Sequence, residues 1–177
     1  MFKKSQWLIL LLPVLMLILI SACNKVGVRT ELYEGKALTI GVVGKPPKVN
    51  ETDIKFNRIQ LTDILKEDFH KSYDGIFIMK DSLYEASEPK YATVYPNSPI
   101  PFFFIETEKS YLPFVDKELS YKGAITVKTK SYATGYLKEK EQITYWEYGL
   151  YNDEVNDNNI RDAYSRIFKT ISENRYK

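Results

Sequence analysis

The sequence predicts an α/β fold in which a single domain is built around a parallel sheet. In the first half of the chain, apolar β-branched runs alternate with helical patterns, and several runs are apolar at every position. Such runs are typical of parallel strands that are buried on both faces. The second half instead alternates apolar and polar residues, which is typical of antiparallel strands with one solvated face. The chain ends in a segment with clear helical periodicity.

Four strands of the parallel core are predicted near residues 38–43, 54–61, 75–79 and 100–105. Between the second and third strands, Thr62 is a candidate N-cap for a helix that runs to about Lys71. After the third strand, Ser82 and Glu85 have the spacing of a capping box, and the helix they begin is expected to end before Pro89.

The second half predicts two antiparallel edge strands, at residues 124–130 and 142–150, with residues 134–136 in or near the turn between them. A C-terminal helix is expected over residues 160–173, with Asn159 as its N-cap and Asp162 at its third position. Its apolar positions follow helical spacing: Ile160, Ala163, Tyr164, Ile167, Phe168 and Ile171.

The first 22 residues differ from the rest and predict a secretion signal. Lys3 and Lys4 precede an apolar run over residues 7–20, and Ser21 and Ala22 follow it. A positive start, an apolar stretch and small residues form the order of a signal peptide. The run is shorter than the roughly 20 residues that a membrane-spanning helix needs. An uncleaved N-terminal anchor is the alternative interpretation.

Residues 20–23, Ile-Ser-Ala-Cys, resemble the lipobox of bacterial lipoproteins. The resemblance implies that diacylglycerol is attached to the Cys23 sulfur and that the chain is cleaved between Ala22 and Cys23. It also implies a protein held on the extracytoplasmic face of the cell membrane. In general character the chain resembles the small lipoproteins of Gram-positive bacilli, a likeness that implies no biochemical activity. Residues 23–36 are then the lipidated cysteine and a polar tether, and residues 37–177 the globular α/β domain.

Composition excludes several classes of site and partner. Cys23 is the only cysteine, so the domain has no internal disulfide and no Cys/His metal pattern. Lys3 and Lys4 are the only charged residues before Cys23, so the mature chain carries equal numbers of basic and acidic residues. This balance argues against a nucleic-acid partner and against polybasic attachment to lipid. We expect no cofactor, and the two acyl chains of diacylglycerol suffice to hold the protein on the membrane.

The sequence contains none of the common catalytic motifs, GxSxG, HExxH, the P-loop or GxGxxG, so no catalytic residue is predicted. The single histidine, His70, is expected to be an ordinary solvent-facing residue on a helix.

Four charged residues are candidates for binding a ligand. If the sheet is parallel, ligands bind at the loops that follow the carboxyl ends of its strands. Those loops carry Lys45, Lys80, Asp81 and Glu106. The lysines would bind an anionic group and the carboxylates a cationic one. Asp81 as a helix cap and the lysines as ordinary surface residues form the alternative, and an acid–base pair of Asp81 with Glu106 is a further one.

The chain has 14 tyrosines, and the aromatic residues crowd its second half: Tyr132, Tyr136, Tyr145, Trp146, Tyr148 and Tyr151. Aromatic residues are enriched in recognition patches but also in ordinary strands. Core and cross-strand packing is the favoured interpretation, and residues 132–136 are the candidate binding surface.

Two functions fit these observations. The first is a membrane-anchored, non-catalytic binding or interaction module with a protein or small-molecule partner. The second is a small-ligand-capturing domain related to the solute-binding lipoproteins of ABC transporters. The lipobox, the tether and the first strand resemble the start of such proteins, but the remaining chain has the length of only one of their two lobes.

Overall fold

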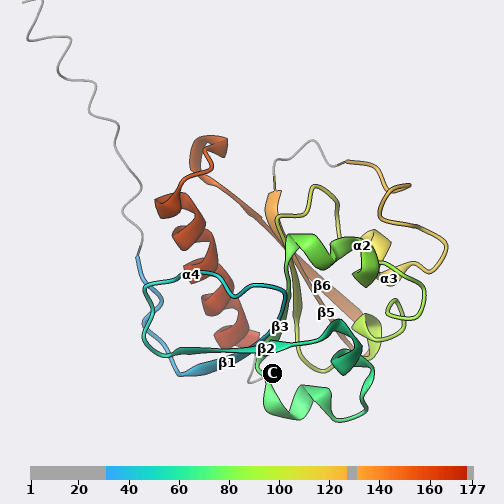
Figure 1. Cartoon of the computed structure of the whole chain (residues 1–177). Coiled ribbons are helices and arrows are strands. Elements are labelled where there is room, and N and C mark those ends of the chain that lie inside the picture. The colour runs from blue at the N-terminus through green and yellow to red at the C-terminus, as the bar shows by residue number, and fades with distance from the viewer. Residues whose placement is uncertain (1–30, 127–130, 175–177) are drawn as a thin grey trace, which may run out of the picture.

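The computed structural model describes residues 31–126 and 131–174, which form a single domain around one six-stranded sheet (Figure 1). The strand order is β2-β1-β3-β4-β5-β6, with parallel and antiparallel neighbours. This architecture confirms the predicted α/β class. The predicted signal peptide, Cys23 and the first part of the predicted tether lie outside the described residues.

Four parallel strands form the larger part of the sheet: β2 (Ile54–Ile59), β1 (Leu38–Val43), β3 (Gly75–Ile78) and β4 (Phe102–Ile105). β5 (Ser131–Glu139) runs antiparallel to β4, and β6 (Gln142–Gly149) runs antiparallel to β5 at the edge. The predicted parallel core and the predicted edge strand at residues 142–150 are therefore confirmed.

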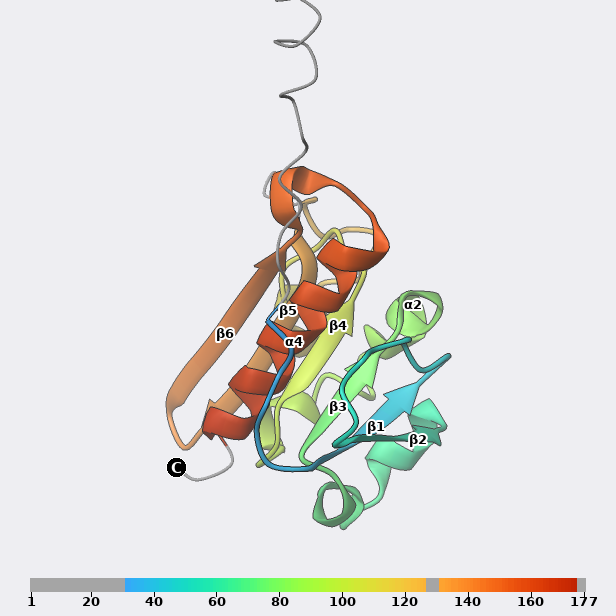
Figure 2. The ribbon, with the colours of Figure 1, turned by 90° about the vertical axis from the view of Figure 1, so that its left-hand side faces the viewer.

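The two faces of the sheet are covered differently. The long helix α4 (Asp157–Asn174) lies along one face, as Figure 2 shows. Short helices cover the other face: η1 (Leu61–Leu65), η2 (Phe69–Ser72), α2 (Leu83–Ala86), η4 (Tyr95–Asn97) and α3 (Leu112–Val115). Two further 3₁₀ turns, η3 (Lys80–Ser82) and η5 (Tyr151–Asp153), lead into α2 and α4.

Each face has its own hydrophobic core, because the central strands are apolar at every position. On the α4 face, Phe77 is fully buried and stacks on Phe168, with ring centroids 6.1 Å apart. On the opposite face, Phe104 stacks on Phe114 with centroids 3.6 Å apart. The run of three phenylalanines in β4 thus serves both cores.

The strand predicted at residues 124–130 is not found as such among the described residues of the antiparallel half of the sheet. Residues 124–126 contribute only an isolated bridge between Thr126 and Lys109, and residues 127–130 lie outside the described part of the chain. The strand that follows, β5, lies inside the sheet between β4 and β6 and not at its edge.

Residues 134–136, predicted near a turn, lie in the middle of β5. The turn is at residues 140–141, where Lys140 has a φ of 55°. Gly135 is required for packing: a Cβ atom there would lie 2.7 Å from the Phe103 ring and 2.8 Å from the Trp146 ring. Residues 132–136 are therefore mostly core, and Tyr136 is buried, so this candidate binding surface is wrong apart from Tyr132.

The predicted cap Thr62 is wrong, because it lies inside η1, whose N-cap is Gln60, and the helix predicted there is divided. The helix expected between Thr62 and Lys71 is two short 3₁₀ helices, η1 and η2. His70 in η2 is half-buried, with its ring against that of Phe69. α2 begins directly after Ser82 and ends before Pro89 as predicted, although the Ser82 side chain makes no capping hydrogen bond.

The C-terminal helix begins earlier than predicted. The Oδ1 atom of Asn156 accepts the backbone N–H of Asn159 at 2.9 Å, so Asn156 caps α4. The side-chain amide of Asn159 is buried and donates to the carbonyls of Tyr151 and Glu154, which ties η5 and the segment after it to the helix.

The last part of the predicted tether packs against the domain. The Tyr33 ring contacts the Phe168 ring edge-on at 6.2 Å, and the Tyr33 backbone N–H donates to the Glu51 carboxylate at 3.4 Å. Ser165 of α4 donates to the same Glu51 oxygen. These contacts fasten the start of the domain and the β1–β2 loop to the same helix.

Candidate functional site

The order of the strands reverses at β1, and this reversal creates a site at the carboxyl edge of the sheet. The chain passes from β1 to β2 on one side of β1 and later returns to β3 on the other side. The loop that leaves β1 packs against the α4 face, whereas the connection that leaves β3 packs against the opposite face. Open α/β sheets bind ligands where two such connections diverge.

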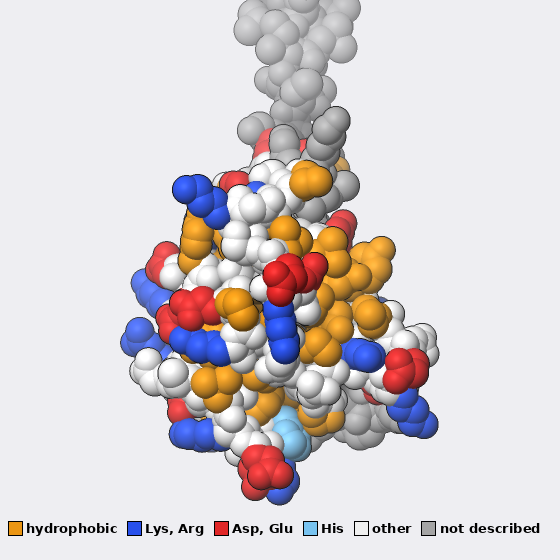
Figure 3. Space-filling model, turned by 90° about the vertical axis from the view of Figure 1, so that its right-hand side faces the viewer, with side chains coloured by type: hydrophobic (Ala, Val, Ile, Leu, Met, Phe, Trp, Pro, Cys, Tyr) orange, Lys and Arg blue, Asp and Glu red, His pale blue; other side chains and the backbone are white. Residues whose placement is uncertain are grey.

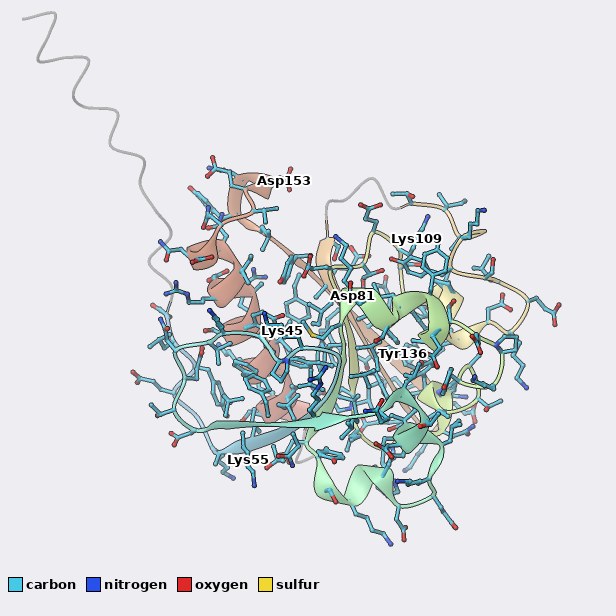
Figure 4. All side chains as sticks on the ribbon, in the orientation of Figure 1. Lys45, Lys55, Asp81, Lys109, Tyr136 and Asp153 are labelled. Carbon is cyan, nitrogen blue, oxygen red and sulfur yellow. The ribbon has the colours of Figure 1, made fainter. Side chains whose placement is uncertain are left out.

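A cleft of about 560 Å³ lies at this point. Its walls come from the β1–β2 loop, the start of η3, the residue after β4, the start of β5 and the first turns of α4. Figure 4 shows Lys45 and Asp81 near this edge, with Lys55 of β2 well away from both. A second hollow, of about 450 Å³, adjoins the cleft and shares Lys80, Glu106 and Tyr132 with it.

The backbone at the ends of β1 and β4 shapes the cleft. Gly44 has a φ of +110°, and a Cβ atom there would lie 2.9 Å from the Cβ of Met79. Glycine therefore lets the loop turn away directly above β3. After β4, Glu106 has a φ of 56°, which is uncommon for a residue other than glycine. Its backbone N–H donates to the Tyr132 carbonyl at 2.6 Å, which holds the turn in place.

Seven charged side chains surround the cleft, and only some of them are paired. The cations are Lys45, Lys48, Lys80 and Arg161, and the carboxylates are Asp81, Glu106 and Asp157. Lys80 lies 3.7 Å from Glu106, and Arg161 lies 3.7 Å from Asp157. Both pairs are long and solvent-exposed, so they contribute little stability and can exchange partners with a ligand.

Two tyrosines form the floor of the cleft. Tyr164 of α4 is 1% exposed, and its ring meets that of Tyr132 edge-on with centroids 6.1 Å apart. Burial raises the pKa of Tyr164, and the neighbouring Tyr132 raises it further. Burial also raises the pKa of Tyr132, against an opposing effect of Tyr164. Both hydroxyls therefore stay protonated at neutral pH.

All four residues predicted to bind a ligand, Lys45, Lys80, Asp81 and Glu106, line this one cleft. Whether they bind a ligand stays a prediction. The alternative acid–base pair of Asp81 with Glu106 is not favoured by the geometry, because the Glu106 carboxylate is paired with Lys80.

Sequence reasoning missed Lys48, Asp157, Arg161 and Tyr164, and it found Tyr132 for a different surface. Lys48 follows Lys45 in the same loop and could have been found with it. The α4 residues could not, because the pattern of an amphipathic helix does not show which end of the sheet its first turn reaches.

Apolar side chains are also exposed on the face opposite α4 (Figure 3). Tyr84 of α2, Leu112 of α3 and Tyr145 of β6 are 62%, 47% and 56% exposed. Tyr145 stacks on Tyr111 with centroids 5.1 Å apart, which extends the core packing outward. Charged residues lie among these side chains, so this face is less suited to a small ligand than the cleft.

Within residues 31–126 and 131–174, no cluster of three or more His, Cys, Asp or Glu residues is suited to a metal ion. The same residues include no helix long and apolar enough to cross a membrane.

The chain matches no protein-family model, no curated protein and no solved structure. A functional assignment therefore depends on the geometry of the cleft and on the N-terminal sequence.

Proposed function

We propose that the protein is a membrane-anchored, extracytoplasmic binding module that holds a small charged ligand in the cleft beside β1 and β3. The cleft itself is the observation that carries the proposal. Five segments that are distant in sequence converge there and place charged groups around a volume of about 560 Å³. Small-molecule sites in proteins typically have volumes of roughly 300–1,000 Å³ and occur where the strand order of such sheets reverses.

The lining favours binding over catalysis. Its carboxylates lie at the rim, where Glu106 and Asp157 face cations, and its hydroxyls are two tyrosines that stay protonated at neutral pH. His70 lies in η2, away from the cleft residues. The groups that line the cleft thus offer charge and hydrogen bonds to a ligand, which are the contacts of a small-molecule binding site.

The N-terminal sequence supports the anchored part of the proposal. With Cys23 lipidated, only the residues between Cys23 and Glu31 separate the lipid from the first described residue. These seven residues give eight Cα–Cα steps between Cys23 and Glu31, which reach at most roughly 27 Å when fully extended. Because Tyr33 packs against α4 soon after this stretch, the domain is held close to the membrane surface.

A second candidate function, a ligand-capturing domain related to the solute-binding lipoproteins of ABC transporters, would use the same cleft. It differs in requiring a permease that receives the ligand. The described residues supply one lobe, so capture by closure of two lobes is not part of this candidate.

A thermal shift screen tests the proposed function. Amino acids, sugars, phosphates, metal salts and short peptides are added to the mature chain, and at least one charged small molecule is expected to raise its Tm by several degrees. The variant Asn50→Trp, which places a large ring at the cleft wall, is expected to abolish that rise.

Thr52→Trp is the matched control, because Thr52 is exposed in the same loop and does not line the cleft. The control is expected to respond as the wild type does. A screen without any response, or a response that survives Asn50→Trp, would show that the cleft is not a ligand site.

A further inference from the structure

Of the four cations that line the cleft, two form ion pairs and two do not. Lys80 and Arg161 each face a carboxylate at 3.7 Å. Lys45 and Lys48, both exposed on the β1–β2 loop, form no ion pair with any described residue. The positive charge available to a ligand is therefore concentrated on this loop.

The loop that carries the two lysines is held in place from both sides. Gly44 begins it with a positive φ, and Pro46 and Pro47 restrict its backbone directly beside Lys45. Further along, Glu51 is fixed by hydrogen bonds from Ser165 and from the backbone of Tyr33. The lysine side chains are thus presented by a positioned backbone, which lowers the entropy lost when they bind.

The floor of the cleft adds a third donor on the same side. Tyr132 lines the cleft together with the two lysines, and its phenol group has one O–H that it can donate. Ammonium groups and a hydroxyl that converge on one cavity match the acceptor atoms of a carboxylate or a phosphate. Around them, Met79 and Ile160 provide apolar surface for the rest of a small molecule.

We infer that the ligand of this cleft carries an oxyanion, a carboxylate or a phosphate, which Lys45 and Lys48 bind from the β1–β2 loop. The inference rests on the proposed function, since it names the ligand class of the same site. The volume of about 560 Å³ limits the bound part to a small molecule or to the headgroup of a lipid.

Titration calorimetry on the mature chain with Cys23→Ala tests the inference. The probes are inorganic phosphate, glycerol 3-phosphate, glutamate, glucose and spermidine, and a separate arm uses vesicles of phosphatidylglycerol in phosphatidylcholine. Glutamate or one of the phosphates is expected to bind, with affinity that falls as salt is added. Binding to vesicles but not to glycerol 3-phosphate would place the oxyanion on a lipid headgroup, and the reverse result would place it on a free metabolite.

The double variant Lys45→Gln/Lys48→Gln is expected to weaken oxyanion binding at least about tenfold, because each lysine makes a hydrogen bond to a charged group. The double variant Lys55→Gln/Lys122→Gln is the matched control. It removes the same charge from exposed positions outside the cleft and is expected to change affinity by less than about twofold. Exposed lysines contribute little to folding, so the Tm of both variants should equal that of the starting chain.

The outcomes separate the inference from the proposed function. Oxyanion binding that is unchanged by Lys45→Gln/Lys48→Gln, or binding of glucose or spermidine alone, would overturn the inference while leaving the cleft as a ligand site. Failure of every probe, together with a thermal shift screen without response, would overturn both.

Discussion

Loss of the lipid on Cys23 is expected to release the mature protein completely from the membrane. Cys23 is the only cysteine in the chain, so no second residue can take the diacylglycerol. The mature chain has equal numbers of basic and acidic residues, and the described part contains no helix that could span a membrane. Fractionation of cells, followed by immunoblotting and an intact mass measurement, should show wild-type protein with lipid in the membrane fraction.

Because cleavage depends on lipidation, the first variant, Cys23→Ala, is expected to stay at precursor length with its apolar N-terminal run. A second variant is therefore the decisive test of release. In that variant, residues 1–23 are replaced by a signal peptide that is removed without lipidation. This chain should appear in the soluble extracytoplasmic fraction at its full mature length. Membrane association of this second variant would show that the protein is held by something other than lipid on Cys23.

A rise in pH above about 10 is expected to destabilise the fold steeply, because several buried tyrosines ionise at a higher pH in the folded chain than in the unfolded chain. Burial raises the pKa of Tyr148 to about 12, whereas a tyrosine in the unfolded chain has a pKa of about 10. Between these values the folded chain binds more protons than the unfolded chain, so the free energy of unfolding falls as pH increases.

The contribution of Tyr148 is fully present below pH 10 and is lost as pH passes 12, a change of about 3 kcal/mol. Burial raises the pKa of Tyr95 and Tyr164 as well, which adds to the loss with the same sign. Urea denaturation at pH 8, 10, 11 and 12 should show a progressive decrease in the unfolding free energy.

Tyr148→Phe is expected to flatten this decrease. At neutral pH the same variant loses the hydrogen bond to Thr170, which measures 2.8 Å, at a cost of about 1 kcal/mol. Tyr151→Phe is the matched control, since Tyr151 is an exposed residue of η5. Equal slopes for wild type and Tyr148→Phe above pH 10 would contradict the assigned burial of Tyr148.

The parallel half of the fold could be predicted because its strands are short and its central strands β1, β3 and β4 are buried on both faces. Residues 38–43 end at Gly44, and Phe102, Phe103 and Phe104 leave no polar face for solvent. Such local patterns identify a strand without knowledge of its neighbours.

The antiparallel half was harder because its pattern depends on partners far away in sequence. Gly135 has the composition signal of a turn, yet it lies in β5 because the Phe103 and Trp146 rings occupy the space that a side chain would need. Likewise, Asn159 has the signal of an N-cap, but the carbonyls of Tyr151 and Glu154 bind its amide inside the helix. Tertiary contacts overrode local propensity at both positions.

The residues of the candidate site that directly follow the ends of parallel strands could be predicted from the sequence. Parallel strands bring their carboxyl ends to one edge, which is sufficient to place Lys45, Lys80, Asp81 and Glu106 near one another. The contributions of Tyr132, Arg161 and Tyr164 depend on the register of β5 and on the docking of α4, and neither is encoded in a short segment.

The claim that the cleft beside β1 and β3 binds a small ligand can be tested most directly by mapping that ligand with ¹H–¹⁵N NMR spectra of the mature chain. Titration of an oxyanion that binds should shift the amide signals of the loop after β1, residues 79–81, Glu106, Tyr132 and the first turns of α4. The signals of β6 and α3 should remain unchanged. Shifts centred on Leu112 and Tyr145 instead would contradict the account, because they would place the ligand on the opposite face of the sheet.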